Sequence, residues 1–82
     1  MIKFTTESGS QYELDEARLQ IRRLSGSMSP TERQGSDGEW KSYALIYESP
    51  EIGKHVLIVW RVTEEGIWQS TRTSPIVALE VT

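Results

Sequence analysis

The sequence contains no cysteine and no asparagine, and it has a single histidine. Without cysteine the chain can form neither a disulfide nor a thiolate zinc site, and without asparagine it has no acceptor for N-glycosylation. The opening residues MIKFTTESGS lack the apolar segment of a secretory signal. Even the apolar run VLIVW at 56–60 is too short to cross a bilayer. We therefore expect a soluble, cytoplasmic protein without membrane contact.

The net charge is −3, from 12 acidic and 9 basic side chains that are interspersed along 82 residues. A protein that binds nucleic acid non-specifically gains most of its affinity by neutralising phosphates, and is usually basic. The overall charge therefore counts against that class, although a local basic face remains compatible with it. A chain of this length forms one domain at most, so we expect a single small β domain over 1–82.

Short alternating segments of apolar and polar residues predict β-strands along most of the chain. Turn signals that contain glycine or proline separate these segments. They cover residues 2–6, 11–15, 18–24, 40–47, 55–62, 67–74 and 76–81, with a long loop at 25–39. This spacing predicts an all-β fold of roughly six to seven short strands, either a small partly closed barrel or two packed antiparallel sheets.

The segment 18–24 is compatible with two structures. As a strand it turns Leu19 and Ile21 inward and Arg18, Gln20 and Arg22 outward; as a helix it aligns Ala17, Ile21 and Leu24. We favour the strand, because Leu19 falls off the helical stripe. In the other segments, alternation assigns the following side chains to the interior: Ile2, Phe4, Tyr12, Leu14, Val56, Ile58, Trp60, Val62, Val77, Leu79 and Val81.

The segment 40–47 carries apolar side chains on both faces of the predicted strand. Trp40, Ala44 and Ile46 would share one face, and Tyr43, Leu45 and Tyr47 the other. One of the two faces therefore needs a cover, which could be the long loop, a second copy of the chain or a partner. Trp40 and Trp68 also lie next to turns, where full burial is difficult.

No group of residues predicts catalysis. His55 begins a strand without a recognisable partner base, and no glycine-rich phosphate loop or nucleophile elbow is present. The SDGE sequence at 36–39 lacks the oxygen spacing of a calcium loop. We therefore predict no catalytic residue, no metal site and no cofactor, and we expect a protein that is not an enzyme.

The loop SGSMSPTERQGSDGEW is long for a small domain, and such connections are usually functional or mobile. Ser29, Pro30, Thr31 and Glu32 have the form of a capping box, which would start one helical turn. Asp37 and Gly38 would stiffen the other end. Because stiff ends reduce the entropy lost on binding, we predict a partner-binding surface composed of Arg33, Gln34, Asp37 and Trp40.

A basic face is the alternative binding surface. Beside aromatic side chains, Arg18, Arg22, Arg61 and Arg72 could bind single-stranded nucleic acid by stacking and cation–π contacts. We favour the simpler interpretation that these arginines are solvated and paired with Glu13, Asp15 and Glu64.

The layout of the chain adds a resemblance. The stretches FTTESGSQYELD, IRRLSG, RQGSDGEWKSY, GKHVLIVW and TSPIVALEV follow one another in an order that resembles small accessory proteins of tailed phages, especially those of actinobacteria. The resemblance implies expression in the cytoplasm of an infected bacterium, and it implies no catalytic residues. Some small phage proteins bind and inhibit host enzymes or defence complexes.

The expected function is therefore that of a non-enzymatic phage protein, monomeric or homodimeric, which binds a host protein and modulates or inhibits it. Two alternatives remain open. One is a small nucleic-acid-binding β-barrel, and the other is a structural or virion adaptor that associates with itself.

Overall fold

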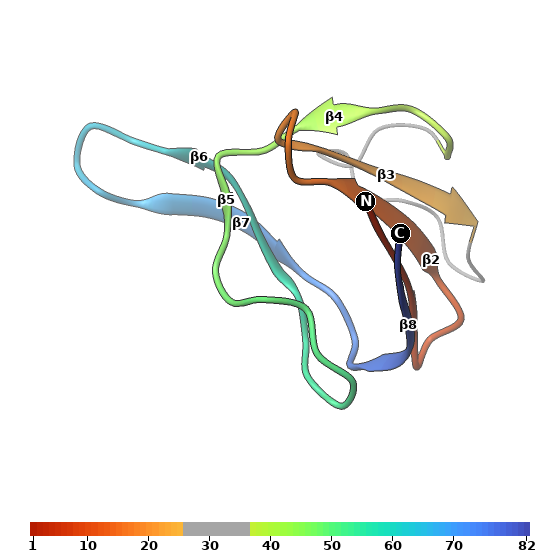
Figure 1. The fold of residues 1–82 in the computed structure, drawn as a ribbon. Coiled ribbons are helices and arrows are strands. Elements are labelled where there is room, and N and C mark those ends of the chain that lie inside the picture. The colour runs from red at the N-terminus through yellow and green to blue at the C-terminus, as the bar shows by residue number, and fades with distance from the viewer. Residues whose placement is uncertain (26–36) are drawn as a thin grey trace.

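The computed structural model describes residues 1–25 and 37–82, which form two antiparallel sheets (Figure 1). The larger sheet has the strand order β4-β3-β2-β1-β8, and the smaller has the order β5-β6-β7. The strands are β1 (Ile2–Thr6), β2 (Gln11–Asp15), β3 (Gln20–Ser25), β4 (Lys41–Ser42), β5 (Leu45–Ile46), β6 (Leu57–Val62), β7 (Trp68–Arg72) and β8 (Ile76–Val81). Within the described ranges there is no helix, and the sheets do not close into a barrel. The all-β prediction is confirmed in its two-sheet form.

The first hairpin follows the predicted alternation. β1 and β2 pair with Phe4 opposite Tyr12 and Ile2 opposite Leu14, and all four side chains are buried. Gly9 lies in the connecting turn with a φ of 89°, a backbone conformation that glycine adopts at little steric cost. Local turn chemistry and apolar alternation agree here, so the sequence alone was sufficient to predict the hairpin.

The third segment is a strand and not a helix, but it begins later than predicted. β3 starts at Gln20, opposite Asp15 of β2, and Arg18 lies in the preceding turn. Leu19 closes that turn with a φ of 53°. Its side chain is 49% exposed, so the prediction that Leu19 points inward is wrong. The reversal from β2 to β3 requires a left-handed residue, and this places Leu19 outside the strand.

The segment 40–47 is not one strand, which corrects the prediction. Its first half pairs with β3 as β4, and its second half pairs with β6 as β5. The crossing lies at Tyr43 and Ala44. The amide of Tyr43 donates to the carbonyl of Leu19, in the turn before β3 (3.0 Å), and that of Ala44 donates to the carbonyl of Val59 in β6 (2.8 Å). By changing sheets, the chain buries Tyr43 and leaves Tyr47 exposed.

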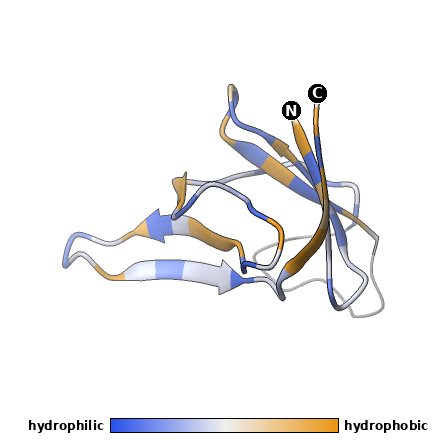
Figure 2. Ribbon diagram, turned by 60° about the horizontal axis from the view of Figure 1, so that its bottom comes forward, coloured by the Kyte–Doolittle hydropathy of each residue, from blue (hydrophilic) through white to orange (hydrophobic). Residues whose placement is uncertain are grey.

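β6 and β7 form a hairpin that extends away from the larger sheet (Figures 1 and 2). Val56 and Ile58 are buried as predicted, but Val62 is 43% exposed, so its predicted inward position is wrong. A bulge is the reason: Val59 pairs with Ser70, Trp60 is skipped, and pairing resumes at the next residue. The extra residue moves Val62 to the outer face of the smaller sheet.

β8 returns the chain to β1 after the corner at Pro75, which lies outside both flanking strands as expected. The register shifts at Thr5 and Thr6, so that the pairing of β8 passes over Val77. The predicted inward position of Val77 is therefore wrong, whereas Val81 shares the face of its register partner Ile2 but is not buried. Val77 turns outward, and Val81 at the end of this edge strand is 74% exposed.

The core lies between the two sheets and is small. Phe4 stacks on Tyr12 with ring centroids 5.0 Å apart. Ile58, in β6, and Val56, which directly precedes β6, belong to the same core cluster. Trp60 packs at the margin of the core, where its indole N–H donates to Oγ1 of Thr71 (2.9 Å). The buried members of the core are Ile2, Phe4, Tyr12, Leu14, Ile21, Tyr43, Val56, Ile58 and Ile76.

Candidate functional site

Asp37, one of the predicted contact residues, is held by an intramolecular ion pair. Its Oδ1 accepts a hydrogen bond from Nη1 of Arg23 at 2.9 Å, and the side chain of Arg23 is only 3% exposed. Nη2 of Arg23 also lies 3.5 Å from Oγ of Ser10. A backbone hydrogen bond joins the same two segments, since the amide of Gly38 donates to the carbonyl of Arg23. Asp37 therefore joins the end of the loop to β3.

The buried Arg23 was missed at the level of the sequence, although a signal for it was present. Residues two apart in a strand share a face, so an inward Ile21 implies an inward Arg23. A buried guanidinium requires a carboxylate partner, and Asp37 is that partner.

Trp40 lies on the solvent side of the larger sheet and is partly buried. The guanidinium of Arg22 lies 4.6 Å from the centre of a Trp40 ring, and Nε of Arg22 donates to Oε1 of Glu13 at 2.9 Å. Glu13 and Arg22 are register partners on β2 and β3. The carboxylate therefore fixes the guanidinium, and the guanidinium covers the indole.

Trp40→Ala is expected to lower the free energy of unfolding by about 1–2 kcal/mol. The change removes one cation–π contact, worth about 0.5–1 kcal/mol at an exposed site, together with part of a large apolar surface. Urea denaturation followed by circular dichroism measures the loss. A loss of about 3–5 kcal/mol, as for a core tryptophan, would contradict the partly buried position. Lys41→Ala, at the next residue of the chain and the first of β4, is the control.

The remaining predicted loop features cannot be placed. Arg33 and Gln34 lie outside the described residues, as does the capping box at 29–32. The predicted partner-binding surface of Arg33, Gln34, Asp37 and Trp40 therefore stays a prediction. Two of its members, Asp37 and Trp40, both have intramolecular contacts at the base of the loop.

The arginines of the alternative basic face are distributed over both sheets. Arg18 lies 3.9 Å from Asp15, and Arg22 is paired with Glu13, as the simpler interpretation expected. Arg61 lies on β6 near the hairpin turn, whereas Arg72 lies at the far end of β7, opposite Leu57. The structure does not gather the four guanidinium groups into one surface.

His55 is exposed, and its Nδ1 lies 3.0 Å from the carbonyl oxygen of Thr73. Among residues 1–25 and 37–82, no three His, Cys, Asp or Glu side chains lie close enough together to hold a metal ion. No helix in the same ranges is long and apolar enough to span a membrane.

The outer face of the smaller sheet carries a surface that the sequence indicated only in part. Two aromatic rings, Tyr47 and Trp68, meet edge-on with their centroids 5.6 Å apart. Val62 is the register partner of Trp68, and Ile67 precedes it in the turn. Tyr47 is 58% exposed, Ile67 63%, and Val62 and Trp68 43% each. We call these four residues the Tyr47–Trp68 patch.

The outer face that carries the Tyr47–Trp68 patch also contains a fully buried side chain, that of Val59. Val59 is not part of the core between the sheets. It pairs with Leu45 on one side and Ser70 on the other. Because Val59 and Ile58 are neighbours in β6 and Ile58 faces the core, Val59 faces outward. The outer face therefore contains enough side chains to cover Val59 completely.

This patch could be predicted from the sequence only in part. Trp68 adjoins a turn, and the two-faced segment 40–47 left an apolar face in need of a cover. The change of sheet at Tyr43 and Ala44 determines which face that is, because it leaves Tyr47 outside. Contact between Tyr47 and Trp68 depends on the pairing of β5 with β6, which local patterns do not specify.

Neither a protein-family model, nor a curated protein, nor a solved structure matches this chain.

Proposed function

We propose that this chain is a non-enzymatic phage accessory protein that binds a protein of the infected host and modulates or inhibits it, and that the Tyr47–Trp68 patch is the surface that binds. The patch itself is the observation that carries the proposal. Tryptophan and tyrosine are the residue types most enriched among the side chains that dominate protein interfaces. Here two of them are exposed together with two aliphatic side chains.

The patch also has the organisation of an interface. Its residues lie on or beside paired strands above the fully buried Val59, so little conformational entropy is lost when a partner orders them. Two charged side chains, Glu64 and Glu65, lie in the turn between Val62 and Ile67. An apolar centre with a polar rim is typical of protein–protein interfaces.

The test begins with capture of the partner from host lysate on immobilised protein. Trp68→Ala and Tyr47→Ala are then expected to weaken binding of the identified partner by roughly 30-fold to 1,000-fold, as at interface hot spots of about 2–4 kcal/mol. Their melting temperatures should stay close to that of the parent, because both rings lie outside the core. Isothermal titration calorimetry and thermal denaturation measure the two quantities.

Val77→Ala is the matched control, since Val77 is 54% exposed but lies on the larger sheet. It should bind like the parent. Unchanged affinity in Trp68→Ala would exclude the patch as the binding surface. Light scattering of the isolated chain shows whether the patch instead joins two copies.

One observation favours a second candidate, the binding of single-stranded nucleic acid. Arg72 pairs with Leu57, which alternation places on the same outer face as Val59. Aromatic rings beside a guanidinium are the elements of single-strand binding. A gel-shift titration with a single-stranded oligonucleotide separates the candidates, because binding to phosphates weakens steeply as salt is raised.

A further inference from the structure

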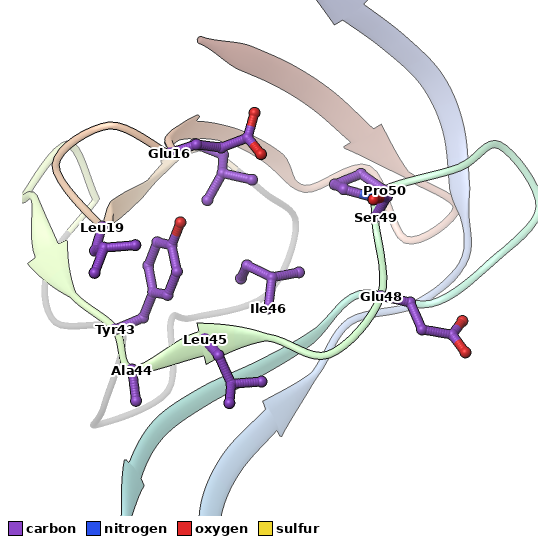
Figure 3. A pocket seen from close by; sticks show the side chains of 10 residues that line it. Glu16, Leu19, Tyr43, Ala44, Leu45, Ile46, Glu48, Ser49 and Pro50 are labelled. Carbon is purple, nitrogen blue, oxygen red and sulfur yellow. The ribbon is translucent and has the colours of Figure 1, made fainter.

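A pocket of about 270 Å³ opens between the turn that precedes β3 and the segment that contains β5. Figure 3 shows it from close by. It is lined by Leu14, Glu16, Leu19, Tyr43, Ala44, Leu45, Ile46, Glu48, Ser49 and Pro50. Pockets for drug-sized ligands usually measure about 300–1,000 Å³, so this one has the size for a fragment or a single side chain.

The floor of the pocket contains a polar group that forms no hydrogen bond with any described residue. Tyr43 is 7% exposed, and Figure 3 shows its ring between Leu19 and Ile46 with the hydroxyl directed into the pocket. No hydrogen bond joins this hydroxyl to a residue in the described ranges, and it is not among the fully buried atoms, so it is accessible from the pocket. A tyrosine with so little exposure usually satisfies its O–H, so the hydroxyl is available for a bound molecule.

The charge around the pocket has one sign. Its lining includes two carboxylates, Glu16 and Glu48, and no cationic side chain. Neither carboxylate is in an ion pair with any residue that the structure describes. Lys54, whose pKa Glu48 helps to raise, is itself paired with Glu51 at 2.9 Å. The electrostatic potential of these carboxylates therefore favours a positively charged group in the pocket.

The same field acts on the tyrosine. Burial raises the pKa of Tyr43 above its ordinary value, and the charges of Glu16 and Asp15 raise it further. At neutral pH the hydroxyl is therefore uncharged and can accept a hydrogen bond from an ammonium or guanidinium group. Leu14 and Ile46 supply apolar surface in the same pocket.

We propose that this pocket binds a cationic group carried on an aliphatic stem, the chemistry of a lysine side chain. The stem packs against Leu14, Leu19 and Ile46, the ammonium group donates to Tyr43, and Glu16 and Glu48 attract its charge. The inference is independent of the Tyr47–Trp68 patch, because none of the four patch residues lines the pocket. Small probes therefore test the pocket whether or not the patch binds a protein.

The experiment is an NMR titration of the isotope-labelled chain with n-butylammonium, followed at the amides of Ala44 and Leu45. We expect saturable binding with a dissociation constant on the order of millimolar, as befits a small fragment. The neutral isostere n-butanol should bind several-fold more weakly. N-acetyl-lysine methylamide and cadaverine form two further arms, and the one that binds more tightly shows whether the source is a polypeptide side chain or a free diamine.

Three variants assign the effect to the pocket. Glu16→Gln and Glu48→Gln should each weaken binding about two- to fivefold, the range of an exposed ion pair. Tyr43→Phe should weaken it about three- to tenfold through the lost hydrogen bond, with unchanged melting because the hydroxyl has no partner in the described chain. Glu64→Gln, in the β6–β7 turn, is the matched control and should bind like the parent.

Two results would overturn the inference. One is equal affinity for n-butylammonium and n-butanol, which would make the pocket merely apolar. The other is unchanged affinity in the Glu16→Gln, Glu48→Gln double variant, since both variants alter exposed side chains and should fold normally.

Discussion

Asp37→Ala is expected to lower the free energy of unfolding by about 2–4 kcal/mol and the melting temperature by roughly 10–30 °C. The guanidinium of Arg23 is almost fully buried, and breaking a buried ion pair by removing one partner is strongly destabilising. Removing the carboxylate takes away a counter-charge that lies 2.9 Å from this guanidinium. The expected loss is below that of a fully buried pair because the side chain of Asp37 is 42% exposed.

The double variant Arg23→Met, Asp37→Ala separates this mechanism from a general disturbance of the loop. An apolar side chain of similar length often replaces a buried ion pair without loss, so the double variant should recover most of the stability. Glu65→Ala, in the exposed β6–β7 turn, should melt like the parent. If Asp37→Ala also melts like the parent, the ion pair contributes nothing to stability.

Phe4→Ala is expected to have the largest effect on stability, about 3–5 kcal/mol. Phe4 is 1% exposed and stacks on Tyr12 across the first hairpin, and it pairs with Leu79 on the other side. The cavity left by alanine would therefore lie in the middle of the larger sheet. For a chain of this length the total stability is roughly 4–12 kcal/mol, so the variant should be close to unfolding at ambient temperature.

Guanidinium denaturation followed by tryptophan fluorescence measures this loss. Phe4→Leu should lose considerably less, because it retains most of the apolar volume. Val81→Ala, at the exposed end of β8, should change stability by at most about 0.5 kcal/mol. A loss in Phe4→Ala no larger than that of Val81→Ala would contradict the position of the core.

Alternation predicted the fold wherever a strand remains regular. Phe4, Leu14 and Ile21 were assigned to the interior from their spacing and are buried. The prediction fails after each irregularity: Leu19 closes a turn, Val62 follows the bulge at Trp60, and Val77 lies at the shift in β8. A single inserted residue exchanges the two faces of a strand, and nothing in the local pattern announces it.

The candidate site depends on long-range pairing, which explains why the sequence indicated it less well. Trp68 could be suspected of exposure because it adjoins a turn. Tyr47 and Tyr43 could not be told apart, since only the change of sheet between β4 and β5 buries one and exposes the other. The pocket beneath Leu19 likewise requires the contact between residues 19 and 43.

The pairing of β1 with β8 has a consequence for the order of folding. Ile2 lies opposite Val81, so the larger sheet gains its fifth strand only after β8 has left the ribosome, although β1 is the first strand to be made. Closing so long a loop is entropically costly, and folds rich in such distant contacts reach the native state slowly. Until then β1 exposes an unpaired edge that can recruit another nascent chain. The vulnerable interval ends when β8 docks.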